Sequence, residues 1–365
     1  MTTDVLIIGG GLSGLHTAYS LHRKGIDAVL VEARSRLGGR ILSRPVKASG
    51  NAGFDLGPTW FWPGQHRIEA LVRDLGLWDR VFEQPSAGDA LYENVGGAVA
   101  RGIDGASMAG SFRLEGGLAR IIAALARHVP KEMVRCGSRA TRISLQGQSL
   151  RTTMACGERE ETIDSAQVVV ALPPRLAARS IALSPELASS QSAAMVGTPT
   201  WMAGQAKLMA LYDEPFWRAD GLSGDAISYR GPLAEIHDAS PRTGGPAALF
   251  GFVGVPAEAR GASVDALREA ALAQLANLFG RHAAQPLDVW IKDWAFDPLT
   301  ATTDDRAAQH AHPPPWSGQP SEATWDHRLI WSGSETAAGG LRNNGYLEGA
   351  LEASERTLRQ LESAG

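Results

Sequence analysis

The sequence predicts an α/β fold that begins with a Rossmann-like unit. Residues 5–8 form an uninterrupted apolar run, as expected for a strand buried on both faces of a parallel sheet. Three glycines follow, then apolar residues at helical spacing as far as Lys24, where Gly25 ends the helix. A second apolar run, 28–31, ends at Glu32. Strand, glycine turn, helix and strand together predict a βαβ unit and a parallel sheet.

The rest of the chain alternates between apolar residues at helical spacing and short apolar runs typical of strands. Residues 66–125 are helical and mixed, with Ile68, Leu71 and Val72 on one helix face. Residues 132–156 predict a β-hairpin that turns at Gly147. The remaining elements expected are a buried strand at 168–172, a helix at 264–279, a strand at 329–331 and a helix from about Tyr346.

Composition excludes several classes of protein. The 365 residues are 44% hydrophobic and 20% charged, which suits a packed core rather than a disordered chain. The net charge is −4 and no basic stripe is present, so a nucleic-acid partner is not expected. No apolar run reaches the roughly 18 residues of a membrane span. The start of the chain lacks a basic segment before its apolar run, so we expect a retained N-terminus and a cytoplasmic protein.

Cysteine and histidine patterns point to no metal centre or disulfide framework. Cys136 and Cys156 lie on either side of Gly147 and could face each other across the hairpin. Two unpaired thiols in a reducing compartment is the more ordinary interpretation. His310 and His312 stand near three prolines, where a solvated loop is a better interpretation than a metal site.

The first glycines form a dinucleotide-binding fingerprint at Gly9, Gly11 and Gly14. They allow a tight turn, a close approach of backbone to a pyrophosphate, and close packing of helix on strand. The following helix offers its N-terminal N–H groups to phosphate. Glu32, at the end of the second strand, can accept from ribose hydroxyls and disfavours a 2′-phosphate, so NADP is not expected.

A second glycine pair, Gly38 and Gly39, lies among Arg34, Arg36 and Arg40. Backbone N–H groups at the glycines and a forked guanidinium could bind a second phosphate. An NAD site does not need this additional element, which favours a different dinucleotide.

From this point the chain resembles the flavin-containing amine oxidase family, the group of the monoamine and polyamine oxidases. Further motifs carry the resemblance in the family's order along the whole chain. These are residues 54–60 (FDLGPTW), 116–118 (GGL), 168–174 (VVVALPP), 207–217 with its closing Phe-Trp pair, 331–336 (WSGSET) and 345–350 (GYLEGA).

The resemblance implies both architecture and activity. It implies an FAD-binding domain made from residues 1–65, 130–175 and 320–365, and an inserted α+β substrate domain made from residues 66–129 and 176–319. It also implies that a small-molecule amine loses a hydride to flavin N5, that water hydrolyses the imine, and that O₂ is reduced to H₂O₂. The oligomeric state is left open.

Lys207 is the first candidate catalytic residue. It interrupts an apolar, strand-like run at 205–211 in a chain with five lysines, and a break of a local rule points to function. The family places this lysine near flavin N5 with a water. A snorkelling lysine, or one paired with an acid, is the alternative. By resemblance, Tyr346 and Trp62 are the other candidates, with core packing as their alternative.

The resemblance and the two glycine motifs together nominate a set of cofactor-binding residues. Glu335 is expected to reach the FAD phosphate or ribityl region, and the helix that begins near Tyr346 is expected to point at the N1–C2=O edge of the flavin. The full set is Gly9, Gly11, Leu12, Ser13, Gly14, Glu32, Ala33, Arg34, Gly38, Gly39, Arg40, Gly57, Pro58, Thr59, Trp60, Ala140, Trp294, Gly333, Glu335, Tyr346 and Leu347.

Two departures from the family pattern stand out. Residues 295–305 contain no cysteine, which predicts that FAD is bound noncovalently. The same residues contain no tyrosine, so another residue must supply the second aromatic wall of the substrate site. The chain is also short for the family, and we expect the missing part to come from the substrate domain. The alternatives to an amine oxidase are an amine dehydrogenase that uses another electron acceptor, a desaturase on the same fold, and a non-catalytic FAD-binding protein.

Overall fold

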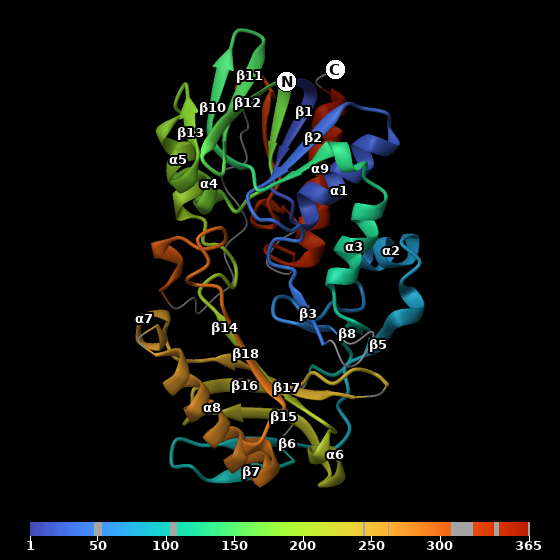
Figure 1. Cartoon of the computed structure of the whole chain (residues 1–365), viewed down its shortest axis with the longest axis vertical. Coiled ribbons are helices and arrows are strands. Elements are labelled where there is room, and N and C mark those ends of the chain that lie inside the picture. The colour runs from blue at the N-terminus through green and yellow to red at the C-terminus, as the bar shows by residue number, and fades with distance from the viewer. Residues whose placement is uncertain are drawn as a thin grey trace.

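The computed structural model describes residues 1–46, 53–102, 108–243, 245–261, 263–307, 324–338 and 343–363. His310 and His312 lie outside these ranges. Two sheets lie one above the other along the long axis, and both chain ends lie beside the first sheet (Figure 1). The predicted α/β class is confirmed.

The first sheet contains the predicted βαβ unit. Its described strands follow the order β13-β10-β11-β12-β1-β2-β9, and β19 lies beside β12. Their bounds are β1 Thr2–Ile8, β2 Ala28–Glu32, β9 Val134–Cys136, β10 Arg139–Gln146, β11 Ser149–Cys156, β12 Arg159–Val170, β13 Ala182–Ser184 and β19 Leu329–Trp331.

The parallel strands of this sheet end together. Ile8 lies opposite both Val31 and Val170, and Val170 lies opposite Trp331. The segments that follow these strands therefore meet at one edge of the sheet, where doubly wound folds bind their ligands. β12 is longer than the strand expected at 168–172, because its first half also pairs with β11.

The predicted hairpin is β10 and β11, with Gly147 at φ +61° in the turn. Two helices, α4 Pro174–Ser180 and α5 Ser189–Gly197, follow β12 with β13 between them. Cys136 ends β9 and Cys156 ends β11, and both are free thiols, so the structure does not support a pairing across the hairpin.

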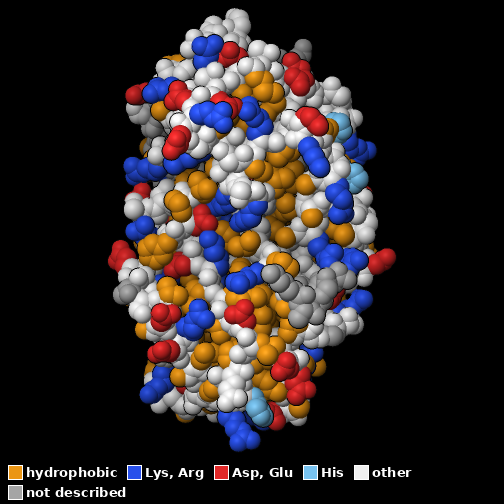
Figure 2. Space-filling view, in the orientation of Figure 1, with side chains coloured by type: hydrophobic (Ala, Val, Ile, Leu, Met, Phe, Trp, Pro, Cys, Tyr) orange, Lys and Arg blue, Asp and Glu red, His pale blue; other side chains and the backbone are white. Residues whose placement is uncertain are grey.

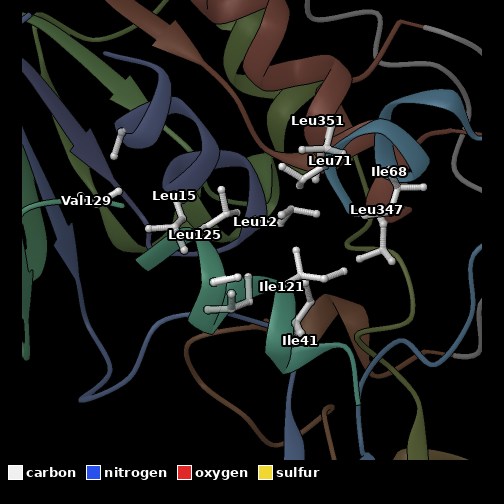
Figure 3. Packing of buried hydrophobic residues seen from close by; sticks show 14 of the residues in the cluster. Leu12, Leu15, Ile41, Ile68, Leu71, Ile121, Leu125, Val129, Leu347 and Leu351 are labelled. Atoms are coloured by element: carbon white, nitrogen blue, oxygen red, sulfur yellow. The ribbon is translucent and has the colours of Figure 1, made fainter. Parts of the chain in front are cut away.

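Four helices share one hydrophobic core with the first sheet. They are α1 Leu12–Arg23, α2 His66–Asp74, α3 Ala119–Arg127 and α9 Leu347–Ser363. In Figure 3, Leu12 and Leu15 of α1 lie beside Leu125 and Ile121 of α3, and Leu71 of α2 lies beside Leu351 of α9. The apolar face of α2 packs against α9 and that of α3 against α1, within the same core.

The second sheet follows the order β18-β14-β17-β16-β15-β6-β7 in the described ranges. The bounds are β6 Asp89–Glu93, β7 Val99–Arg101, β14 Ala206–Tyr212, β15 Leu222–Ser228, β16 Leu233–Asp238, β17 Ala247–Val253 and β18 Asp288–Asp293. Helices α6 Phe216–Ala219, α7 Ala257–Arg260 and α8 Val264–Phe279 accompany it. The predicted stripe of α8 (Leu267, Ala271, Leu275 and Leu278) is buried against this sheet.

Short strand pairs occupy the region between the two sheets. β3 Ser43–Pro45 pairs with β4 Gly53–Asp55, and β5 Val81–Glu83 pairs with β8 Phe112–Leu114. On the face shown in Figure 2, hydrophobic side chains gather along the middle of the molecule, between the levels of the two sheets. The division into two domains with the stated boundaries stays a prediction.

The described residues contain neither a membrane-spanning helix nor a cluster of metal ligands. No helix in them is long and apolar enough to cross a bilayer. No group of three or more His, Cys, Asp or Glu side chains among them could hold a metal ion.

Candidate active site

A cavity of about 380 Å³ connects the carboxyl edge of the first sheet with one face of the second sheet. It brings together most of the residues that the sequence nominates. These are Gly9, Gly11, Leu12, Ser13, Glu32, Arg34, Gly38, Gly39, Arg40, Gly57, Pro58, Thr59, Trp60, Trp62, Lys207, Trp294, Gly333, Tyr346 and Leu347.

Four nominated residues do not line the cavity: Gly14, Ala33, Ala140 and Glu335. A Cβ atom at Gly14 would lie 2.0 Å from the carbonyl oxygen of Gly9, so this glycine serves the close packing of helix on strand. Ala140 is buried in a hydrophobic cluster of the first sheet. The predicted contact of these four residues with a cofactor stays a prediction.

The turn between β1 and α1 is shaped for an anion. Gly9 has φ +109°, and a Cβ atom there would lie 2.6 Å from the carbonyl oxygen of Ala171. Gly11 precedes the helix in an extended conformation, and α1 has neither a side-chain cap nor an acid in its first turn among the described residues. The uncapped N–H groups and the positive end of the helix dipole therefore suit a phosphate.

Glu32 is held rigidly at the adjacent strand end. Its Oε2 accepts from the N–H of Gly10 at 2.8 Å, and its Oε1 accepts from the N–H of Arg34 at 2.8 Å. The side chain is almost fully buried yet lines the cavity. A carboxylate oriented in this way keeps lone pairs for the hydroxyl groups of a ribose.

The second glycine pair lies directly against the first motif. Gly38 donates its N–H to the carbonyl of Gly10 at 2.7 Å, and a Cβ atom at Gly39 would lie 3.3 Å from the Cα atom of Gly11. Arg36 uses its guanidinium on the carbonyls of Leu37, Gly39 and Ile41. The arginine therefore supports this loop rather than the cavity.

Glu335 supports the cavity wall from behind through Arg40. It is fully buried and pairs with Arg40 through both oxygens, at 2.6 and 3.1 Å. Arg40, which lines the cavity, also donates to Ser334 and to the carbonyl of Trp201. Glu335 thus fixes the position of Arg40 at the cavity wall, and a contact of Glu335 itself with the cofactor stays a prediction.

The segment after β18 closes one side of the cavity. Asp297 accepts from Arg34 at 2.7 Å and from Lys292 at 2.8 Å. Burial alone would raise the pKa of Asp297, but these two cations more than offset it and leave that pKa below its usual value. Trp294 donates its indole N–H to the carbonyl of Leu56 at 2.9 Å, so the nominated tryptophan is fixed against the 54–60 loop.

Lys207 lies on the wall contributed by the second sheet. Its Nζ donates to the carbonyl of Gly57 and to the hydroxyl of Thr59, both at 2.8 Å, and to the carbonyl of Asp55 at 3.3 Å. It also lies 4.2 Å from the centre of the Phe250 ring. The buried lysine therefore fixes the backbone of the 55–59 loop at the cavity wall.

Two ionisable groups meet behind this loop. Burial lowers the pKa of Lys207 to about 7, while the nearby Asp55 carboxylate opposes the shift. Burial raises the pKa of Asp55 to about 6, although Ser43 and Lys207 oppose it. The site therefore holds a lysine that loses its proton close to neutral pH.

Aromatic side chains surround the same end of the cavity. The ring of Tyr346 lies 6.1 Å from that of Trp62 and 6.3 Å from that of Trp201. Trp201 and Phe252, which no sequence motif indicates, also line the cavity. No local pattern marks Trp201, whose place beside Tyr346 depends on the packing of segments far apart in the chain. It is a candidate for the second aromatic wall.

The residues present fit FAD. The cavity runs from a ribose-binding carboxylate, past two glycine turns and an uncapped helix end, to an apolar region with Lys207 and three large aromatic rings. Gly9 and Gly39 leave the space that a side chain would fill, which allows a long, twice-phosphorylated dinucleotide to approach the backbone.

Two family models match the chain. The model described as flavin containing amine oxidoreductase matches residues 90–360, which is well over half of the chain. The model described as an NAD(P)-binding Rossmann-like domain matches residues 7–75, which include the glycine turn.

Similar proteins extend over nearly the full chain. A protein named as flavin-containing monoamine oxidase AofH in Mycobacterium tuberculosis is 24% identical over 467 aligned positions, with 99% of this chain and 96% of that protein covered. A short region, 20% of the chain, is 42% identical to amine oxidase [flavin-containing] B of Homo sapiens and covers 14% of it.

Solved structures share the fold. Wild-type putrescine oxidase bound to putrescine superposes with a TM-score of 0.83 at 19% identity, covering 100% of this chain and 99% of that one. Cyclohexylamine oxidase from Brevibacterium oxydans has a TM-score of 0.80 at 19% identity, with 99% of each chain covered.

Proposed function

The chain belongs to the flavin containing amine oxidoreductase family and is an FAD-dependent amine oxidoreductase, and from this premise we propose that it is an oxidase. In this proposal the substrate is a small-molecule amine, the electron acceptor is O₂, and FAD is bound noncovalently. Family membership favours an enzyme over the non-catalytic alternative.

One observation carries the proposal. A single cavity joins a dinucleotide-binding edge, with Glu32 and the uncapped start of α1, to an apolar chamber that holds Lys207, Tyr346 and Trp62. A cofactor that extends from one end to the other would meet an amine among aromatic rings. Such walls exclude water and restrict the orientation of the amine.

When FAD is bound, it supplies the redox chemistry. A hydride is removed from the α-carbon of the amine, and the two electrons are then transferred to O₂, which gives H₂O₂. The chain's own residues prepare the site for it. Lys207 holds the 55–59 loop through three hydrogen bonds. Because its pKa is lowered to about 7, it is partly uncharged at neutral pH and repels a cationic substrate less than an ordinary lysine would.

Noncovalent attachment is supported by the cavity wall. The described lining residues include neither cysteine nor histidine, and the two cysteines of the chain lie in β9 and β11 of the first sheet. Denaturation of the purified yellow protein should therefore release FAD into the supernatant. Flavin that stays with the precipitated protein would contradict this part of the proposal.

Anaerobic reduction of the flavin, followed by admission of air, tests whether the protein is an oxidase. A panel of amines is added to the purified holoenzyme without oxygen, and loss of the flavin absorbance is recorded. We expect bleaching by at least one amine and rapid recovery, with H₂O₂ formed, when air enters. Bleaching with slow recovery would favour the dehydrogenase alternative, and an alkene product in place of an imine would favour the desaturase alternative.

A further inference from the structure

The backbone of Trp201 is bound on both sides by the ion pair of Arg40 and Glu335. Its N–H donates to Oε1 of Glu335 at 3.2 Å, and its carbonyl accepts from Nη1 of Arg40 at 3.0 Å. The same Nη1 also donates to Oε1 of Glu335 at 2.6 Å. Segments that are far apart in the chain therefore form one closed ring of hydrogen bonds around a fully buried carboxylate.

Arg40 keeps one N–H for a ligand. A guanidinium has five N–H donors. Nη1 donates to Trp201 and Glu335, and Nη2 donates to Ser334 and Glu335. The Nε–H has no acceptor among the described residues, and Arg40 lines the cavity next to Gly39. An anion in the cavity would accept from this N–H, so the arginine links the dinucleotide edge to Trp201.

The backbone around Trp201 leaves its side chain little freedom. Met202, the next residue, has φ +59°, a left-handed conformation that is uncommon outside glycine. A Cβ atom on Gly345 would lie 2.4 Å from the Cβ atom of Trp201, so the two segments are in direct contact. Tyr346 follows Gly345, and its ring lies 6.3 Å from that of Trp201. The place of the indole therefore depends on the hydrogen bonds that hold this backbone.

The residue before Trp201 is held by a different carboxylate. The N–H of Thr200 donates to Oδ1 of Asp305 at 3.0 Å, and Arg175 donates to the same oxygen at 2.7 Å. Asp305 does not line the cavity. Two adjacent amides thus have separate anchors, and of these two the amide of Trp201 is the one linked to the cavity.

We propose that Glu335 is a positioning residue that couples the two ends of the cavity: through Arg40 it fixes Trp201, a specificity-determining residue of the apolar chamber around Lys207 and Tyr346. An anion at Arg40 stabilises the ring of hydrogen bonds and so orders the aromatic wall. When FAD is bound, its phosphates supply that anion, and the chamber is prepared for the amine. This inference rests on the proposed function and adds a coupling between cofactor and substrate sites.

Hydrogen exchange at single-residue resolution tests the coupling in the purified protein, with FAD bound and after its removal. We expect bound FAD to slow exchange of the Trp201 amide by about tenfold in the wild type, within the usual range of coupling between two sites. The Thr200 amide is the internal control and should change much less. Equal exchange of the Trp201 amide in the two forms would overturn the coupling.

Glu335→Gln tests the carboxylate as the link, at saturating FAD. A carboxamide has one acceptor oxygen and cannot serve Arg40, Ser334 and Trp201 together, so the slowing by FAD should be lost at Trp201. Glu258→Gln removes the same charge from an exposed position outside the cavity and should keep the slowing.

A second variant serves where Glu335→Gln does not fold. Arg40→Lys keeps the positive charge and loses the forked donors, so it should also lose the slowing at Trp201. Slowing that persists in either variant would show that the ion pair is not the link.

A double-mutant cycle tests the effect on the amine. Calorimetry on dithionite-reduced holoenzyme, which cannot oxidise the amine, gives Kd for cyclohexylamine. We expect Trp201→Leu to weaken binding by about tenfold, as for loss of an aromatic contact. Glu335→Gln should weaken binding in the same direction, and the double variant should be no weaker than Trp201→Leu alone.

Trp78→Leu, which removes an indole outside the cavity, is the control for the cycle. Losses that add in the double variant would contradict an action of Glu335 through Trp201. A wild type that does not bind cyclohexylamine would overturn Trp201 as a specificity-determining residue.

The proposed function is judged separately. If no amine bleaches the flavin, but FAD slows exchange at Trp201 only when Glu335 is intact, amine oxidation fails and the coupling stands. If amines are oxidised while the Trp201 amide exchanges equally with and without FAD, the oxidase stands and the coupling fails.

Discussion

The Nζ atom of Lys207 donates to the backbone carbonyl of Asp55 at 3.3 Å, while the carboxylate of Asp55 accepts from Ser43 and from the N–H of Leu118. The lysine and the acid are thus neighbours without a direct ion pair. Lys207 orders the loop at the cavity wall, and Asp55 ties the start of that loop to the start of α3.

Lys207→Met should slow turnover or flavin reoxidation by about tenfold or more, with FAD retained. The variant leaves the carbonyl of Gly57 and the hydroxyl of Thr59 without their donor, so the 55–59 loop loses its support. Stopped-flow absorbance measures both steps, and Lys131→Met, at an exposed position, is the control. Unchanged rates in both steps would remove Lys207 from the site.

Stability should depend on pH in two windows. The pKa of Lys207 is about 7 in the folded protein and 10.5 for an ordinary lysine. Between about pH 7 and 10.5 the unfolded chain therefore holds a proton on Lys207 that the folded protein has lost. The contribution of Lys207 to the free energy of unfolding therefore increases as pH rises from about 7 to 10.5. Asp55 has a raised pKa of about 6 against 3.8, so its contribution decreases as pH rises from 3.8 to about 6.

Urea unfolding across pH compares wild type with Lys207→Met. We expect the slope above pH 7 to be smaller in the variant, since the group that titrates is gone. A slope that does not change would show that Lys207 ionises with an ordinary pKa in the folded protein.

Glu32→Gln should weaken FAD binding by roughly ten- to a hundredfold. A carboxamide has one oxygen, so it cannot accept from Gly10 and Arg34 and also receive a ribose hydroxyl. The ratio of flavin to protein absorbance after gel filtration reports retention, and Glu214→Gln, an exposed acid, is the control. Full flavin content in Glu32→Gln would argue against the ribose role.

Asp297→Asn should destabilise the protein by about 3 kcal/mol and speed the loss of FAD. Asp297 is largely buried and binds both Arg34 and Lys292, so its loss removes the anion of Lys292 and leaves Arg34 only its longer ion pair with Glu32. Asp304→Asn breaks the exposed pair with Arg179 and should cost at most about 1 kcal/mol. Thermal unfolding and flavin release compare the two variants, and equal effects would contradict a closing role for Asp297.

Local chemistry made part of the site predictable. The glycine turn, Glu32 and the second glycine pair lie within forty residues of sequence, where steric demands and strand periodicity leave little choice. Lys207 could be singled out because a lysine in an apolar strand breaks a local rule. The pairing of Glu335 with Arg40 could not be predicted, because the two residues are 295 positions apart and no local pattern indicates such a pairing.

The sequence by itself determined the βαβ unit, the hairpin, the long helix before β18 and the place of the dinucleotide edge, since each follows from periodicity and glycine conformation over short distances. Tertiary structure alone decided that α2 packs against α9 and α3 against α1, that Trp201 lies beside Tyr346, and that Phe252 lies opposite Lys207. These relations depend on strand register and on packing between distant segments. Such arrangements are set by the burial of whole helix and sheet faces. Sequences with the same local pattern can bury these faces in different arrangements.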